Sequence, residues 1–199
     1  MPHIAARGTL PRMRRYIRAV VPGATYFFTL TLQDRRCATL IHGVDHLRAA
    51  FTEIRTRHPF DIDAMVVLPD HLHLLITLPA DDARYAMRLA LIKGAFTRRM
   101  AAAQRLDSRA LQARGARGER SLWQRRYWEH QIRDENDYAR HVDYIHFNPV
   151  KHGHAARAGD WPYSSFHRYV RHGVLPADWG LAAGADKGGF GERSDWASS

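Results

Sequence analysis

Hydrophobic and polar residues alternate along residues 25–32, the first regular pattern in the chain. Aromatic or aliphatic side chains take every second position, and threonine takes three of the four positions between them. Successive side chains of a strand point to opposite faces, so this pattern predicts a β-strand with one buried face. Pro22 and Gly23 indicate a turn just before it.

Two further runs, residues 60–68 and 72–78, are rich in β-branched and aliphatic residues. Only Pro69, Asp70 and His71 separate them, which is typical of neighbouring strands. A further strand running to Ile132, with Trp128 and Ile132 inward, is one of two interpretations of the segment that begins at Trp123.

Three stretches have the character of helices. Residues 44–57 carry apolar side chains at helical spacing and stop before Pro59, and residues 85 to about 105 are rich in strong helix formers. A third helix is expected to begin at Asp134, a suitable N-cap residue, and to end at Pro149.

A His-hydrophobic-His triplet stands at the start of the strand 72–78. His71 and His73 should project to one side of that strand while Leu72 points to the other. At a rise of ~3.3 Å per residue the two imidazoles are about 6.6 Å apart, and they can close on one metal ion if a third ligand arrives from elsewhere. A chain with 13 histidines also contains such triplets by chance, and solvated histidines are then the alternative.

The third helix carries two stripes. The stripe expected to be buried comprises Tyr138, Val142 and Ile145. A polar stripe, a quarter-turn or more away, comprises His141, Tyr144 and Asn148. Tyr144 and Asn148 are four residues apart and present a hydroxyl and an amide side by side. The alternatives are a surface tyrosine at 144 and an asparagine at 148 that caps the next turn.

Charge indicates a polyanionic partner, most often nucleic acid. The chain has 30 Lys and Arg against 20 Asp and Glu, a formal net charge of +10. Residues 1–21 form an acid-free, arginine-rich segment, either an arm that touches phosphates or an extension with no role. Residues 84–128 hold twelve basic and two acidic residues, with a mobile basic insertion expected at about 106–121. Residues 180–199 are expected to be disordered.

Candidate DNA-binding residues combine these cations with aromatic rings that can stack on unpaired bases. They are Arg14, Arg15, Lys93, Arg98, Arg99, Trp123, Arg125, Arg126 and Tyr127. For the segment 123–128 the alternative is a set of core aromatics, and we expect Arg125 and Arg126 to point outward in either case. A single cysteine, Cys37, excludes an intramolecular disulfide and indicates a reducing compartment.

These parts suit the cleavage of a phosphodiester through a covalent intermediate. A divalent cation on His71 and His73 can polarise a phosphate oxygen, and Asn148 can be its third ligand, which favours Mg²⁺ or Mn²⁺. Tyr144 is the candidate nucleophile. Because tyrosine titrates near 10, the metal or Lys151 must help it to ionise.

Three ordered motifs, at residues 68–73, 122–130 and 143–153, resemble the signatures of the REP-associated tyrosine transposases, where REP denotes repetitive extragenic palindromes. This family belongs with the single-tyrosine insertion-sequence transposases in the HUH endonuclease superfamily. The resemblance covers roughly residues 14–179. It implies an α+β, ferredoxin-like sandwich with a central antiparallel sheet flanked by helices, the histidine pair lying on a central strand, in a catalytic domain of residues 22–179.

The resemblance also implies metal-dependent nicking and strand transfer on single-stranded DNA hairpins. The metal ligands then fall on His71, His73 and Asn148, and the nucleophile on Tyr144. Such a protein is expected to be cytoplasmic, bacterial and nucleoid-associated, without a membrane span, and a monomer or homodimer whose site is completed within one chain or across two. The alternative of a different class is a domesticated protein that binds hairpins without cutting them.

Two other classes of metal enzyme are disfavoured. A cupin requires a glutamate a few residues after the triplet, and residues 74–78 hold none. An amidohydrolase requires an eight-stranded barrel that 199 residues cannot comfortably build.

Overall fold

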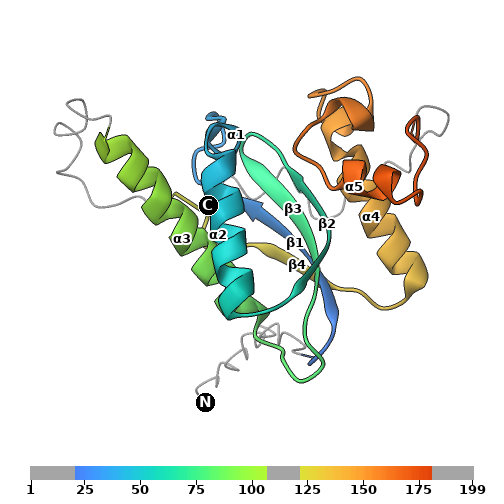
Figure 1. The fold of residues 1–199 in the computed structure, drawn as a ribbon, viewed down its shortest axis with the longest axis horizontal. Coiled ribbons are helices and arrows are strands. Elements are labelled where there is room, and N and C mark those ends of the chain that lie inside the picture. The colour runs from blue at the N-terminus through green and yellow to red at the C-terminus, as the bar shows by residue number, and fades with distance from the viewer. Residues whose placement is uncertain (1–20, 107–121, 181–199) are drawn as a thin grey trace, which may run out of the picture.

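The computed structural model describes residues 21–106 and 122–180, and its architecture is α+β (Figure 1). Four antiparallel strands form one sheet in the order β2-β3-β1-β4. The strands are β1 (Thr25–Thr31), β2 (Asp61–Val67), β3 (His71–Thr77) and β4 (Trp128–Gln131). The helices are α1 (Thr39–His42), α2 (Val44–Arg57), α3 (Tyr85–Leu106), α4 (Glu135–Lys151) and α5 (Phe166–Arg171), with a 3-10 helix η1 (Ala158–Asp160). The predicted central antiparallel sheet flanked by helices is confirmed.

Strand β1 is buried on both faces, so the prediction of one buried face was wrong. Its even-numbered residues, from Tyr26 to Leu32, pack into the core cluster under α2 and α3. Phe27 points the other way, into a second cluster that includes residues of α4. Helices therefore cover both faces of the sheet, as Figure 1 shows. Thr29 and Thr31, between the apolar residues, are buried rather than in solvent.

A buried ion pair fixes the start of α3. The Asp82 carboxylate accepts a hydrogen bond from the Arg84 backbone N–H at 2.6 Å and from the Arg88 guanidinium at 3.0 Å. Arg88 is only 2% exposed and also donates to the carbonyl oxygen of Pro59. These bonds hold the pKa of Asp82 well below its usual range, so the pair stays charged where α3 meets the loop after α2.

Helix α4 begins as predicted but extends past Pro149. The Asp134 side chain accepts from the backbone N–H of Asp137 at 2.8 Å, which is an N-cap. The prediction that Pro149 ends the helix was wrong by two residues. A proline costs the helix its own N–H bond, but the following N–H groups still find carbonyls: the His152 N–H donates to the Asn148 carbonyl at 3.0 Å.

The segment after α4, for which the sequence shows no usable pattern, covers the edge of the sheet. Backbone bonds join Val67 to Tyr163 at 2.9 Å and Met65 to Ser165 at 2.8 Å. The Trp161 indole N–H donates to the Val67 carbonyl at 2.9 Å. Strand β2 would otherwise expose a row of unpaired backbone groups, and this segment satisfies them while packing beside α4.

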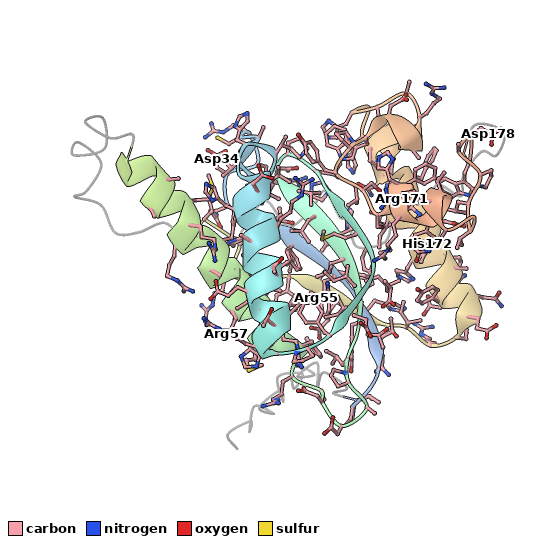
Figure 2. The ribbon with its side chains drawn as sticks, in the orientation of Figure 1. Asp34, Arg55, Arg57, Arg171, His172 and Asp178 are labelled. Carbon is pink, nitrogen blue, oxygen red and sulfur yellow. The ribbon has the colours of Figure 1, made fainter. Side chains whose placement is uncertain are left out.

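The predicted N-terminal arm, the basic insertion and the C-terminal tail fall almost entirely outside the described residues. Within residues 21–106 and 122–180, no helix has both the length and the apolar character needed to cross a membrane. Basic side chains occur on both flanks of the molecule: Figure 2 shows Arg55 and Arg57 at the end of α2, and Arg171 and His172 at the end of α5 on the opposite side.

Candidate active site

The histidine pair begins strand β3 and faces α4. His71 pairs with Thr31 and His73 with Thr29 on the neighbouring strand β1, whereas Leu72 packs into the opposite core. The two imidazole rings are 5.0 Å apart, centroid to centroid, with their planes at 82°. Their side chains are 4% and 0% exposed, so the alternative of solvated histidines does not hold.

Each histidine is held through its Nδ1 atom. His71 Nδ1 lies 2.7 Å from Asp70 Oδ1, and Arg35 donates to the other oxygen of that carboxylate at 2.6 Å. His73 Nδ1 lies 2.9 Å from the hydroxyl of Thr29. Burial alone would raise the pKa of Asp70, but the hydrogen bonds from His71 and Arg35 outweigh it and lower that pKa strongly. The carboxylate is therefore ionised and orients the ring of His71.

Both bonds use Nδ1, so a metal ion would be held through Nε2 of each ring. The Nε2 atoms of both histidines are shielded from solvent, and that of His71 has no hydrogen-bond partner among the described residues. A metal-binding imidazole commonly donates its other ring N–H to a carboxylate, as His71 does to Asp70, and His73 Nδ1 shares a hydrogen bond with the Thr29 hydroxyl. The residues thus fit a divalent metal ion, with Asp70, Thr29 and Arg35 as supporting groups.

Tyr144 lies directly opposite this pair on α4. Its ring centroid is 5.1 Å from that of His73 and 5.9 Å from that of Phe27, and the side chain is 7% exposed. The Lys151 ammonium lies 4.9 Å from the centroid of the same ring. One chain therefore brings together the strand histidines, the helix tyrosine and a cation.

The polar stripe of α4 faces the sheet and is as buried as the apolar stripe. His141 and Asn148 are both 0% exposed, and the ring of His141 lies 4.9 Å from that of Phe27. The expectation of two faces, only one of them buried, is corrected: the sheet covers one side of α4 and the segment after it covers another. Asn148 Oδ1 is shielded from solvent, and Asn148 lies one turn beyond Tyr144 on the same helix.

A second cluster of potential metal ligands lies where β4 meets α4. Ligand atoms of His130, Asp137 and His141 lie within 4.8 Å of one another. A bound ion lies in the plane of each imidazole that binds it, yet the rings of His130 and His141 are stacked at 4.8 Å with only 13° between their planes. His130 Nε2 instead donates to the Asp137 carboxylate at 2.7 Å, and His141 Nδ1 to the Asp137 carbonyl at 2.7 Å. The geometry fits a hydrogen-bonded clamp that fastens the tyrosine helix to the sheet.

We expect Asp137→Asn to destabilise the fold by about 1.5–3 kcal/mol at neutral pH, since it removes charge-assisted bonds to a buried carboxylate. Burial acts to raise the pKa of Asp137, but the hydrogen bonds from His130 and from the Arg133 N–H lower it. A lowered pKa means that this stabilisation is complete above about pH 4, the usual value of an unfolded aspartate, and is lost as the pH falls through the folded value.

Urea unfolding of the two proteins at pH 7 and again below pH 3 measures this effect. The difference between wild type and variant should shrink at the lower pH. The exposed Asp45, which pairs with Arg48 on α2 at 2.8 Å, provides the control, because Asp45→Asn should cost under about 1 kcal/mol. An Asp137 variant as stable as the Asp45 variant would argue against the clamp.

The structure divides the expected DNA-binding residues. Trp123 is 2% exposed and packs on Phe96 in the core, so the expectation that it stacks on bases is corrected: its strand-like bridge to Leu32 buries the ring. Lys93 is also turned inward, with its ammonium 2.8 Å from the Gln124 carbonyl and its pKa lowered by burial.

The remaining cations are accessible to different degrees. Arg98, Arg125 and Arg126 are exposed, and the half-buried Arg99 pairs with Glu53 at 2.8 Å. Tyr127 is half-buried with its ring edge-on to Phe28 at 5.8 Å. Arg14 and Arg15 lie outside the described residues. Among the expected DNA-binding residues that the structure describes, the exposed cations are therefore Arg98, Arg125 and Arg126.

Several residues of the site escaped sequence reasoning. The only sequence clue to Asp70 was its position directly before the triplet. The only clue to Thr29 was its place in the alternating strand, where strand pairing puts it opposite His73. His152 follows Lys151 in the third motif, and its ring lies 5.3 Å from that of His71. The spacing of His152, one helical turn after Asn148, could have indicated from the sequence that it lies at the site.

Comparison with known proteins shows the family of this chain. Residues 21–148 match the family described as "Transposase IS200 like". A REP-associated tyrosine transposase of Haemophilus influenzae is 45% identical over 168 residues, which cover 84% of this chain and 94% of the relative. A REP-associated tyrosine transposase of Escherichia coli K12 is 41% identical over 167 residues, covering 84% and 91%.

A solved structure extends the agreement to the fold. The structure of a REP-associated tyrosine transposase bound to a REP hairpin superposes with a TM-score of 0.75 at 40% identity, covering 90% of this chain and 96% of that one. Sequence and fold together place the chain among the tyrosine transposases. The chain belongs to the IS200-like transposase family, and the relatives that it matches there are REP-associated tyrosine transposases.

Proposed function

We propose that this chain is a metal-dependent endonuclease and strand transferase for single-stranded DNA, which binds REP-type hairpins and cleaves beside them. The observation that carries the proposal is the pairing of the Tyr144 ring with the ring of His73 at 5.1 Å, with His71 at the same site. A nucleophile and a pair of metal-ligating imidazoles at this separation can act on one phosphodiester.

In the proposed reaction the Tyr144 oxygen attacks phosphorus and the bond from phosphorus to the 3′ oxygen breaks. The phenol loses its proton and the 3′ oxygen gains one, so the products are a 5′-phosphotyrosyl link and a free 3′-hydroxyl. Attack by another 3′-hydroxyl on that link reverses the chemistry, joins the strands and restores the tyrosine. No outside energy source is needed, because one phosphoester replaces another.

His71, His73 and Asn148 are the proposed metal ligands. When bound, Mg²⁺ or Mn²⁺ supplies charge that polarises a non-bridging phosphate oxygen. Asp70 and Thr29 hold the two rings, Phe27 packs against both His73 and Tyr144, and Lys151 adds positive charge beside the phenol. Because one chain supplies all of these groups, a monomer is sufficient in this proposal, and a dimer is not required to complete the site.

Hairpin binding is proposed on the relative's printed description, which is of a protein bound to a REP hairpin, together with the exposed cations of this chain. We expect the chain to bind a REP hairpin with a single-stranded flank much more tightly than a blunt duplex of equal length. The reason is that the half-exposed ring of Tyr127 can stack only on unpaired bases. Affinity should fall steeply with salt.

Fluorescence anisotropy across a salt series, with the cleavage of an end-labelled strand followed in parallel, tests both halves of the proposal. The double variant Arg125→Ala, Arg126→Ala should weaken hairpin binding about tenfold or more. It should also reduce the slope of log affinity against log salt concentration by about one or two. Arg48→Ala, which removes an exposed arginine of α2, should leave both the affinity and the salt dependence unchanged. Equal affinity for hairpin and duplex would contradict the proposed partner, and tight hairpin binding without a nick would favour the non-cleaving alternative.

A further inference from the structure

His152 lies beside the proposed metal ligands without belonging to the histidine triplet. It is the C-cap residue of α4, and its backbone N–H donates to the carbonyl of Asn148 one turn earlier at 3.0 Å. Its exposed imidazole lies edge-to-face with that of His71, with a centroid separation of 5.3 Å and an interplanar angle of 75°. The helix that carries the nucleophile therefore delivers a third imidazole to the site.

The geometry of this pair matches that of two ligands of one ion. With a metal–nitrogen bond of ~2.1 Å, the ion lies roughly 3.2 Å from each ring centroid, so two imidazoles bound at neighbouring positions have centroids about 5 Å apart. His71 and His73 meet this condition at 5.0 Å and 82°, and His71 and His152 meet it at 5.3 Å and 75°.

Other histidine pairs of the described residues do not meet it. His130 and His141 are stacked almost parallel at 13°, which prevents one ion from lying in both ring planes. His152 and His154 are 6.1 Å apart with 27° between their planes, and His154 instead packs on Trp161 at 5.5 Å. The two pairs that include His71 share a centroid separation near 5 Å and a large angle between the ring planes.

We propose that His152 is an additional metal ligand, so that the site presents three imidazole nitrogens and the amide oxygen of Asn148. This inference rests on the proposed function, and it makes that site more specific. Mg²⁺ prefers oxygen ligands. A nitrogen-rich set of ligands instead favours first-row transition metals, and its affinity for them rises from Mn²⁺ to Co²⁺. The chain should therefore bind Mn²⁺ and Co²⁺ in preference to Mg²⁺.

Calorimetric titration of the full chain without DNA and without a histidine tag tests the assignment, with Mg²⁺, Mn²⁺ and Co²⁺ as the probes. Wild type should show one tight Co²⁺ site, and Co²⁺ should bind more tightly than Mn²⁺ and Mn²⁺ more tightly than Mg²⁺. His152→Ala should weaken Co²⁺ binding at least tenfold and change the visible absorption of the bound Co²⁺, while Mg²⁺ affinity changes less than threefold. His152 is exposed at a helix end, so this variant should fold normally.

His154→Ala is the matched control, because it removes the next imidazole along the chain and should leave the Co²⁺ affinity within twofold. His71→Ala should remove the tight site. Wild-type Co²⁺ affinity and spectrum in His152→Ala would overturn the proposal, as would tighter binding of Mg²⁺ than of Mn²⁺ by wild type. Because no DNA is present, the result is independent of cleavage: a chain that binds Co²⁺ through His152 yet never nicks DNA would uphold this assignment and contradict the proposed function.

Discussion

Tyr144→Phe should abolish cleavage while leaving the fold and hairpin affinity intact. The ring keeps its contacts with Phe27, His73 and the Lys151 ammonium, and only the attacking oxygen is lost. We expect the nicking rate to fall by at least about a thousandfold, the loss typical of removing a nucleophile, and the free energy of unfolding to change by less than about 1.5 kcal/mol. A labelled hairpin substrate on a denaturing gel measures both the nick and the covalent protein–DNA adduct.

Tyr138→Phe is the matched control for that experiment. Tyr138 lies on the same helix and is half-buried, and burial together with a hydrogen bond to Tyr169 raises the pKa of its hydroxyl, which makes it a poorer nucleophile. This variant should cut within about threefold of wild type. An adduct that persists in Tyr144→Phe and disappears in Tyr138→Phe would identify Tyr138 as the nucleophile and contradict the proposal.

His71→Ala and His73→Ala should each reduce nicking as severely as chelation does, because each removes a ligand nitrogen that is held in place from behind by Asp70 or Thr29. Hairpin affinity should stay within about fivefold, since the basic surface and not this pair supplies most of it. Gel assays with and without EDTA, and with added Mn²⁺ or Mg²⁺, measure the effect, and circular dichroism monitors folding.

His42→Ala provides a control for general loss of an imidazole, because His42 is exposed on α1. The nicking activity of the His42→Ala variant should match that of wild type in Mn²⁺ and vanish in EDTA. Full cleavage by wild type after exhaustive chelation would remove the metal from the mechanism, whatever the behaviour of the histidine variants.

Local patterns were sufficient to predict much of the fold. The helix at 44–57, the two strands flanking residues 69–70 and the N-cap at Asp134 depend on periodicity, a proline or a capping side chain, and each of these acts over a few residues. The common face of His71 and His73 follows from strand geometry alone.

Features that depend on distant segments were not predictable in this way. Trp123 combines an aromatic ring with neighbouring arginines, a pattern that fits both base stacking and a core, and only its pairing with Leu32 and contact with Phe96 decide for the core. The supporting bond from Thr29 to His73 joins residues 44 positions apart. The cover on β2 by residues 161–165 has no periodic signal, because its backbone pairs irregularly with the strand edge.

The helix boundary at Pro149 shows a different limit. Proline disfavours a helix at its own position, but near the end of a helix it costs only one backbone bond, and the following turn can still close. The two further helical residues have a consequence for the site, because they place Lys151 over the Tyr144 ring and His152 beside His71.

The identity of the residue that becomes joined to DNA tests the central claim most directly. Wild-type protein is incubated with Mn²⁺ and a REP hairpin strand, the adduct is digested with protease and nuclease, and the modified peptide is sequenced by mass spectrometry. The proposal predicts a nucleotide 5′-phosphate on Tyr144, within the peptide that contains Asn148. A phosphate on any other residue, or cleavage that leaves no covalent adduct at any time, would contradict it.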